Sequence, residues 1–158
     1  MKLTTDIFSE FDQVWALVTA GTPDNFNTMT ISWGGMGTLW GKPVATVYIR
    51  TSRYTHEFVD ANEYFTISFY PEEYKKVLGV LGSKSGREMD KMHSSGLTPK
   101  YLDKGITFEE AKYTLFFISH GGKLILVRRR SIIPEHRTQR KSSKDNILAG
   151  RCQNSARF

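Results

Sequence analysis

The sequence predicts an α+β fold in which antiparallel strands predominate and helices are inserted between them. Short β-branched and apolar segments lie close together along the chain, and the helical segments do not alternate regularly with them as in a doubly wound sheet. Asn27–Trp33 also alternates with period two, which is typical of a strand with one buried face. At 158 residues, the chain has the usual length of a single domain.

The first part of the chain contains three predicted strands separated by turns. Val14–Thr22 is short, apolar and β-branched, and it ends in turn-forming residues. A Pro-Asp turn leads into Asn27–Trp33, whose odd-numbered residues share one face of the strand. A Gly-Lys-Pro turn precedes the third strand, Val44–Arg50. The strands are neighbours in sequence, which favours an antiparallel barrel or an α+β sheet.

The middle of the chain mixes helices and strands. Tyr54–Asn62 is helical in pattern, with Thr55 as a candidate N-cap. Tyr64–Tyr70 is a fourth strand, and Pro71–Gly82 is a helix that begins with proline and acidic residues and ends in glycine. Two further segments are a loop leading into a short helix, Ser83–Gly96, and an extended segment, Ile106–Phe117.

Four glycines and two tryptophans crowd the stretch that follows the second strand. The cluster does not fit a dinucleotide-binding motif, because its spacing is off by one and a turn and strand follow it instead of a helix. The glycines mark either a bend in a strand or a place where the backbone approaches a flat ligand. We predict that Trp33 is a wall or lid of such a site and that Trp40 belongs to the core.

The junction Arg50–Glu57 combines arginines and hydroxyl side chains with a predicted helix N-terminus. Free backbone N–H groups and arginines at such a place bind anions, including phosphate. The alternative is a solvated loop with ordinary capping by Thr55. Ser85–Lys91 alone indicates only a polar loop with a capped helix. The four histidines show no metal-ligand spacing, and no Gly-x-Ser-x-Gly motif is present.

Composition excludes several classes of protein. The chain has no N-terminal apolar segment typical of a signal peptide and no apolar run of the ~18 residues that a spanning helix needs. One cysteine, Cys152, excludes an internal disulfide, so we expect a cytoplasmic protein. The net charge of +6 is unevenly distributed. Residues 1–116 carry 12 basic and 14 acidic residues, whereas residues 117–158 carry 10 and 2.

Several separated segments together resemble the flavin reductase and flavoredoxin-like family. The resemblance extends over about residues 12–115 and rests on the order and spacing of five motifs: LVTAGT, NTMTISWGG, VYIRTSRYTHE, YFTISFY and SGREMDKMHSSGLTP. It implies an antiparallel Greek-key split β-barrel that binds FMN, usually as a homodimer. It also implies electron transfer from NAD(P)H through FMN to a small-molecule or protein acceptor.

The resemblance also implies which residues hold the cofactor. The flavin ring would pack against the Asn-x-Met-Thr-x-x-Trp strand, and the Arg-x-x-x-x-Thr loop would hold the phosphate. Lys91 is the candidate for stabilising the reduced flavin, since a fixed cation stabilises a developing anion. The implied cofactor-binding residues are Asn27, Thr28, Met29, Thr30, Ser32, Trp33, Gly34, Arg50, Ser52, Arg53, Thr55 and Lys91.

The family pattern is lost after Leu115, and the sequence divides into residues 1–116 and a basic, aromatic-poor segment, 117–158. Three readings of that segment are open: a basic arm for nucleic acid, a divergent tail, or a shifted reading frame near Phe116. A barrel without its closing strand would have an unpaired edge. The alternatives to a flavin-dependent oxidoreductase are therefore a flavin-binding module without turnover and, with less support, a nucleic-acid-binding protein.

Overall fold

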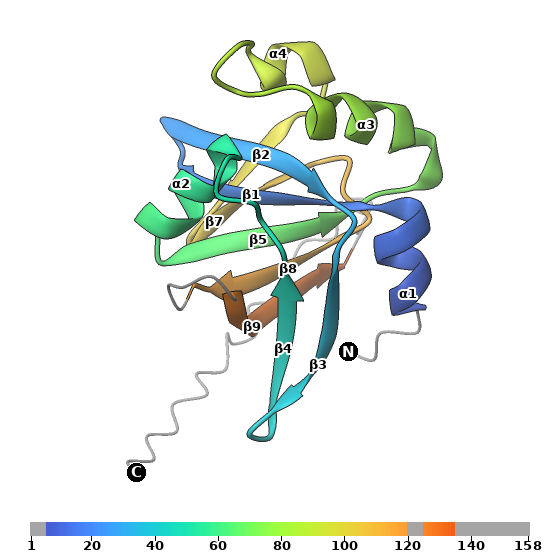
Figure 1. Ribbon diagram of the computed structural model, residues 1–158, viewed down its shortest axis with the longest axis vertical. Helices are drawn as coiled ribbons and strands as arrows, with labels where there is room; N and C mark the ends of the chain where they lie inside the picture. The colour runs from blue at the N-terminus through green and yellow to red at the C-terminus, as the bar shows by residue number, and fades with distance from the viewer. Residues whose placement is uncertain (1–5, 120–124, 135–158) are drawn as a thin grey trace, which may run out of the picture.

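A computed structural model describes residues 6–119 and 125–134 of the chain (Figure 1). The elements in chain order are α1 (Ile7–Ser9), the π-helical turn η1 (Glu10–Val14), β1 (Ala16–Thr22), β2 (Asn25–Ile31), β3 (Gly34–Leu39), β4 (Lys42–Val47), α2 (Tyr54–Ala61), β5 (Tyr64–Phe69), the 3₁₀ turn η2 (Glu72–Tyr74), α3 (Lys75–Ser83), α4 (Lys91–Ser95), β6 (Pro99–Leu102), β7 (Gly105–Phe108), β8 (Tyr113–Ile118) and β9 (Ile125–Pro134). The predicted class, mainly antiparallel strands with inserted helices, is confirmed.

Seven strands form one antiparallel sheet in the order β2-β1-β5-β8-β9-β4-β3, and β6 and β7 form a separate hairpin. The hairpin lies against β1 and β5. Helices α3 and α4 lie together beyond β2, whereas the β3–β4 hairpin extends from the opposite end of the molecule (Figure 1).

The connection from β2 to β3 forces this sheet to curl. These consecutive strands are the two edges of the sheet, yet only Ser32 and Trp33 separate them. Seven flat strands spaced ~4.8 Å apart would place the edges about 29 Å apart. Three Cα–Cα steps span at most about 11 Å. The edges must therefore meet at this corner, where the Tyr48 N–H donates to the Trp33 carbonyl at 3.4 Å.

The curled sheet encloses one apolar cluster, and a second lies beneath α3. Because successive side chains of a strand point to opposite faces, β1 contributes to both. Val18 belongs to the cluster that includes Phe65, Ile67 and other sheet residues, while its neighbour Leu17 packs with Leu78 of α3. Both faces of β1 are thus buried, which accounts for the run of apolar residues Ala16–Val18 at its start.

Several predicted boundaries were wrong. The first strand begins at Ala16, because η1 continues to Val14 and Trp15 then reverses the chain with φ 70°. The segment Gly34–Leu39 is a paired edge strand and not merely a bend. Trp40 is not in the core: it lies in the hairpin turn with φ 50° and is 88% exposed.

The chain after Leu115 continues the sheet. The extended segment predicted for residues 106–117 is two strands, β7 and β8, separated by a turn, and β8 runs through position 116. The backbone of β9 pairs with β8 on one side and β4 on the other, so the edge expected to be unpaired has a neighbour here. The remainder of the basic segment lies outside the described residues, and the domain division and the reading-frame hypothesis stay predictions.

At the β2–β3 corner, Gly34 has no room for a side chain, whereas the next residue, Gly35, does. A Cβ at Gly34 would lie 2.6 Å from the Thr46 carbonyl oxygen and 2.9 Å from the Phe11 ring, whereas one at Gly35 would have no described atom within 4 Å. We expect Gly34→Ala to lower the free energy of unfolding by ~1–3 kcal/mol, because backbone must shift. The matched control Gly35→Ala should change it by less than ~0.5 kcal/mol. Urea unfolding of both variants checks this, and equal midpoints would contradict it.

Candidate functional site

Strand β2 and the segment that follows it supply one wall of a hollow beside the β2–β3 corner. The hollow has a volume of about 110 Å³. Its lining residues are Met29, Thr30, Ile31, Ser32, Trp33, Tyr48, Arg50 and Arg53. We call it the Trp33 hollow. Trp33 and Tyr48 are 65% and 55% exposed, so large aromatic surfaces stand at its rim without being part of the core.

A second, smaller hollow of about 60 Å³ lies at the N-terminus of α2. Its lining residues are Asn27, Met29, Ser52, Arg53, Tyr54, Thr55, Gly82, Lys84, Ser85, Gly86 and Lys91. We call it the Lys91 hollow. Since Met29 and Arg53 line both hollows, the two are neighbours.

The N-terminus of α2 makes this region electropositive. Arg53 is the N-cap residue, and no side chain caps the helix. The first N–H groups of any helix lack partners within the helix and carry a partial positive charge. Arg53 lines the Lys91 hollow beside these groups, and the exposed Arg50, whose carbonyl accepts from the Arg53 N–H at 2.9 Å, lines the neighbouring Trp33 hollow. The arrangement is suited to an anion such as phosphate.

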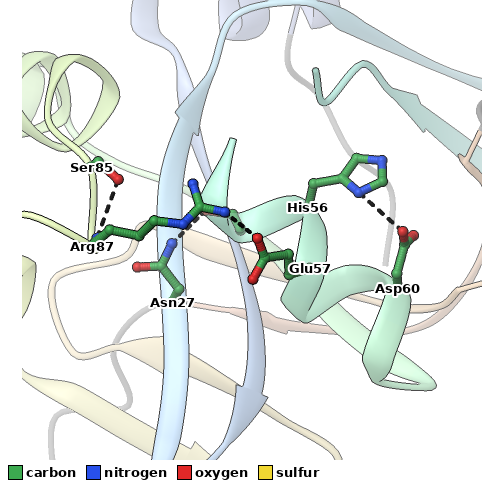
Figure 2. A network of polar contacts seen from close by, with 7 residues as sticks. Asn27, His56, Glu57, Asp60, Ser85 and Arg87 are labelled. Carbon is green, nitrogen blue, oxygen red and sulfur yellow. Dashed lines mark hydrogen bonds and ion pairs between the residues drawn. The ribbon is translucent and has the colours of Figure 1, made fainter. Parts of the chain in front are cut away.

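Thr55 is not the N-cap of α2, as the sequence pattern suggested. It lies inside the helix and is buried, and its hydroxyl accepts a hydrogen bond of 2.8 Å from Nδ2 of Asn27. Figure 2 shows the Asn27 side chain. The bond joins β2 to α2 across 28 positions of sequence. Thr55 therefore fixes the Asn27 amide at the wall of the Lys91 hollow.

Lys91 lies at the base of the same hollow and is buried. Its Nζ donates to the Thr28 carbonyl at 3.0 Å and to the Leu81 carbonyl at 2.8 Å. Arg53 Nη1 likewise donates to the Gly82 carbonyl at 3.3 Å. Both cations thus approach the C-terminal end of α3, where helix carbonyls are partially negative. Burial and, secondarily, the charge of Arg53 lower the pKa of Lys91 from 10.5 to about 8.

Ten of the twelve cofactor-binding residues expected from sequence line one of these two hollows. The exceptions are Thr28 and Gly34. The Thr28 hydroxyl lies in the sheet beside Thr19 and donates to the Val18 carbonyl at 3.1 Å, so only its backbone carbonyl reaches Lys91. Gly34 lines neither hollow and instead allows close packing against Thr46 and Phe11 at the β2–β3 corner. Whether the twelve bind flavin stays a prediction.

Some lining residues were not predicted from sequence. Tyr48 belongs to the third predicted strand, and Tyr54 begins the predicted helix, but neither carried a signal for the site. Ser85 and Gly86 lay in a segment interpreted only as a polar loop. The glycine of the Ser-Gly pair was a local signal for the site, because glycine permits close approach of the backbone to another group. In the structure, a Cβ at Gly86 would lie 2.4 Å from Asn27 Oδ1.

Residues 6–119 and 125–134 contain neither a candidate metal site nor a helix that could span a membrane. No group of three or more His, Cys, Asp or Glu side chains there could hold a metal ion. No helix in the same ranges is long and apolar enough to cross a membrane. His120 and His136 lie outside the described residues.

Comparison with known proteins identifies the family. The sequence profile of the family described as "Flavin reductase like domain" matches residues 8–115. The chain belongs to this family. The match confirms the resemblance seen over residues 12–115, and it contains all twelve expected site residues while excluding β9.

Among curated proteins, the chain is similar to a high molecular weight rubredoxin of Moorella thermoacetica, with 36% identity over 77 residues. The match spans 48% of this chain and about a third (32%) of the rubredoxin.

Solved structures share the flavin reductase-like fold. Flavoredoxin of Desulfovibrio vulgaris (Miyazaki F) superposes with a TM-score of 0.69 at 22% identity, covering 77% of this chain and 69% of that one. An FMN-binding protein from Thermus thermophilus, with bound 1-cyclohex-2-enone, gives 0.68 at 23% identity, covering 85% and 78%. Flavoredoxin from Methanosarcina acetivorans gives 0.70 at 18% identity, covering 88% and 77%.

The buried charge of Lys91 predicts a pH dependence of stability. Its pKa is lower in the folded protein than in the unfolded chain, so between pH 8 and 10.5 the unfolded chain binds more protons. The free energy of unfolding should therefore rise with pH across this window, by at most about 3 kcal/mol, and the rise should be absent in Lys91→Met.

Urea unfolding of wild type and Lys91→Met at pH 7.5 and 10 measures this difference, and titrations elsewhere in the chain cancel in the comparison. The exposed Lys76 of α3 provides the control, since Lys76→Met should keep the rise. A difference between wild type and Lys91→Met that does not change with pH would show that Lys91 titrates normally.

Proposed function

We propose that this protein is an FMN-dependent oxidoreductase of the flavin reductase or flavoredoxin type, which passes electrons from NAD(P)H to an acceptor. The observation that carries the proposal is the adjacency of the two hollows. The Trp33 hollow offers apolar and aromatic surface for a flat ring from Met29, Ile31, Trp33 and Tyr48, beside hydroxyls and the two arginines. The Lys91 hollow combines cations, hydroxyls and a helix N-terminus suited to a phosphate. FMN has both parts in one molecule.

The donor set fits the cofactor chemically. Arg53 and Arg50 can make charge-assisted hydrogen bonds with phosphate oxygens, and Ser52 offers a hydroxyl. Met29, Trp33 and other residues of the Trp33 hollow offer apolar surface to the ring. Micromolar binding requires about 8 kcal/mol, which a few such bonds of ~1.5–3 kcal/mol and ring burial could supply.

Bound FMN would supply the chemistry of accepting two electrons from a nicotinamide and passing them on. The protein's part is to bind, orient and shield. Lys91, held by two backbone carbonyls, keeps its proposed role of stabilising the reduced flavin with a fixed positive charge. Trp33 shields the open face of the Trp33 hollow. In this proposal the protein works as a homodimer, in which a second copy would cover the exposed Trp33 and Tyr48.

The phosphate cradle can be tested by comparing two ligands. Arg53→Gln should weaken FMN binding by about 10- to 150-fold through loss of a charge-assisted bond. The same substitution should leave the affinity for riboflavin, which lacks the phosphate, within about 3-fold. Lys42→Gln, on the exposed start of β4, is the control and should change neither. Fluorescence titration gives both constants, and equal losses for the two ligands would count against a phosphate at Arg53.

Electron transfer is tested by an anaerobic spectrum. Purified protein with FMN should show the oxidised flavin bands near neutral pH, and these should bleach on addition of NADH or NADPH. Binding without bleaching would favour the alternative of a flavin-binding module without turnover. Protein that neither carries flavin nor takes up added FMN would exclude the proposed function.

A further inference from the structure

The segment between α3 and α4, Lys84–Asp90, forms one wall of the Lys91 hollow. Gly86 stands against Asn27 so closely that a Cβ there would meet Asn27 Oδ1 at 2.4 Å. Within the segment, the Glu88 and Met89 N–H groups donate to the Ser85 carbonyl at 3.1 and 3.3 Å. These bonds make a compact turn from Ser85 to Met89, and the side chain of Arg87 within this turn is exposed.

Arg87 connects this turn to α2, the helix whose Tyr54 and Thr55 line the Lys91 hollow. Its Nη2 forms an ion pair with Glu57 Oε1 on α2, and its guanidinium carbon lies 4.6 Å from the centroid of the Tyr54 ring. In Figure 2 the side chain of Arg87 crosses in front of Asn27 to reach Glu57. Through Arg87, the segment Lys84–Asp90 is joined to α2, the helix whose N-terminus faces the hollow.

This connection is well suited to breaking and re-forming. The side chains of Arg87 and Glu57 are 46% and 58% exposed, and ion pairs this exposed shift an equilibrium by only about 2- to 5-fold. The ends of the segment are held more firmly. Asp90 caps α4 by accepting from the Met92 and His93 N–H groups, and Lys91 is anchored in the hollow. Between these ends, Arg87 reaches α2 through its ion pair with Glu57 and its contact with the Tyr54 ring.

We propose that Arg87 is a positioning residue that latches Lys84–Asp90 against α2 and so controls how fast a phosphate-bearing ligand enters and leaves the Lys91 hollow. The inference rests on the proposed flavin site. Ser85 and Gly86 of this segment line the hollow directly, and its volume of about 60 Å³ has room for only a few water molecules, so the position of the segment sets the space left for a phosphate with its sugar-alcohol chain. After entry, closure of the latch holds the ligand against the N-terminus of α2.

The test uses the full-length chain and a double-mutant cycle. Arg87→Gln and Glu57→Gln should each accelerate FMN dissociation by about 2- to 10-fold without slowing association, as measured by stopped-flow fluorescence. The double variant should resemble the single variants, because each removes the same pair. Lys100→Gln is the matched control, since the Lys100–Glu109 ion pair of 2.9 Å is similarly exposed but lies in the β6–β7 hairpin region.

Amide hydrogen exchange of ligand-free protein separates this inference from the proposed function. Faster exchange confined to residues 84–90 in Arg87→Gln supports the latch even if no flavin binds. Unchanged exchange there, or FMN dissociation equal to that of wild type and Lys100→Gln, overturns it. Slower FMN association with faster exchange across the whole sheet also overturns it, because Arg87 would then serve general stability.

Discussion

The structure depends on one short connection, the two residues between β2 and β3. Because these strands are opposite edges of a seven-stranded sheet, Ser32 and Trp33 can join them only if the sheet curls upon itself. The curl encloses the apolar cluster and closes at Gly34, whose lack of a side chain lets β4 and Phe11 approach. The same corner forms the wall of the Trp33 hollow. The two residues that allow the sheet to curl therefore also line the Trp33 hollow.

A second set of contacts ties the site to the fold through the end of α3. Carbonyls of Leu81 and Gly82 accept hydrogen bonds from Lys91 and Arg53, so the helix is held against β2 and α2 by two cations. Such bonds satisfy helix-end carbonyls, but they also keep positive charge partly buried, at a cost in stability. An anion bound in the Lys91 hollow would offset that cost. The residues that stabilise α3 are thus suited to holding a phosphate.

In the chain after Leu115, the amino-acid composition changes while the strand pairing continues. Charge and aromatic content change abruptly at residue 117, yet β8 continues to Ile118, and β9 occupies the place between β8 and β4. The ladder between β8 and β9 shifts register between Leu115 and Phe117, where the family match also ends. Every residue except proline offers the same backbone N–H and C=O groups, so a strand can pair where the family pattern has already ended.

The sequence by itself determined the antiparallel class, most strands and helices, and the family, because these depend on local periodicity, turn residues and motif order. It could not determine what individual side chains do. The pattern predicted Thr55 as a helix cap, but its hydroxyl binds the Asn27 amide. Trp40 was predicted in the core and is exposed. Lys91 donates to the Thr28 carbonyl, 63 positions away in sequence. Only the tertiary structure decided these, since each depends on contacts between segments far apart in sequence, which local patterns do not encode.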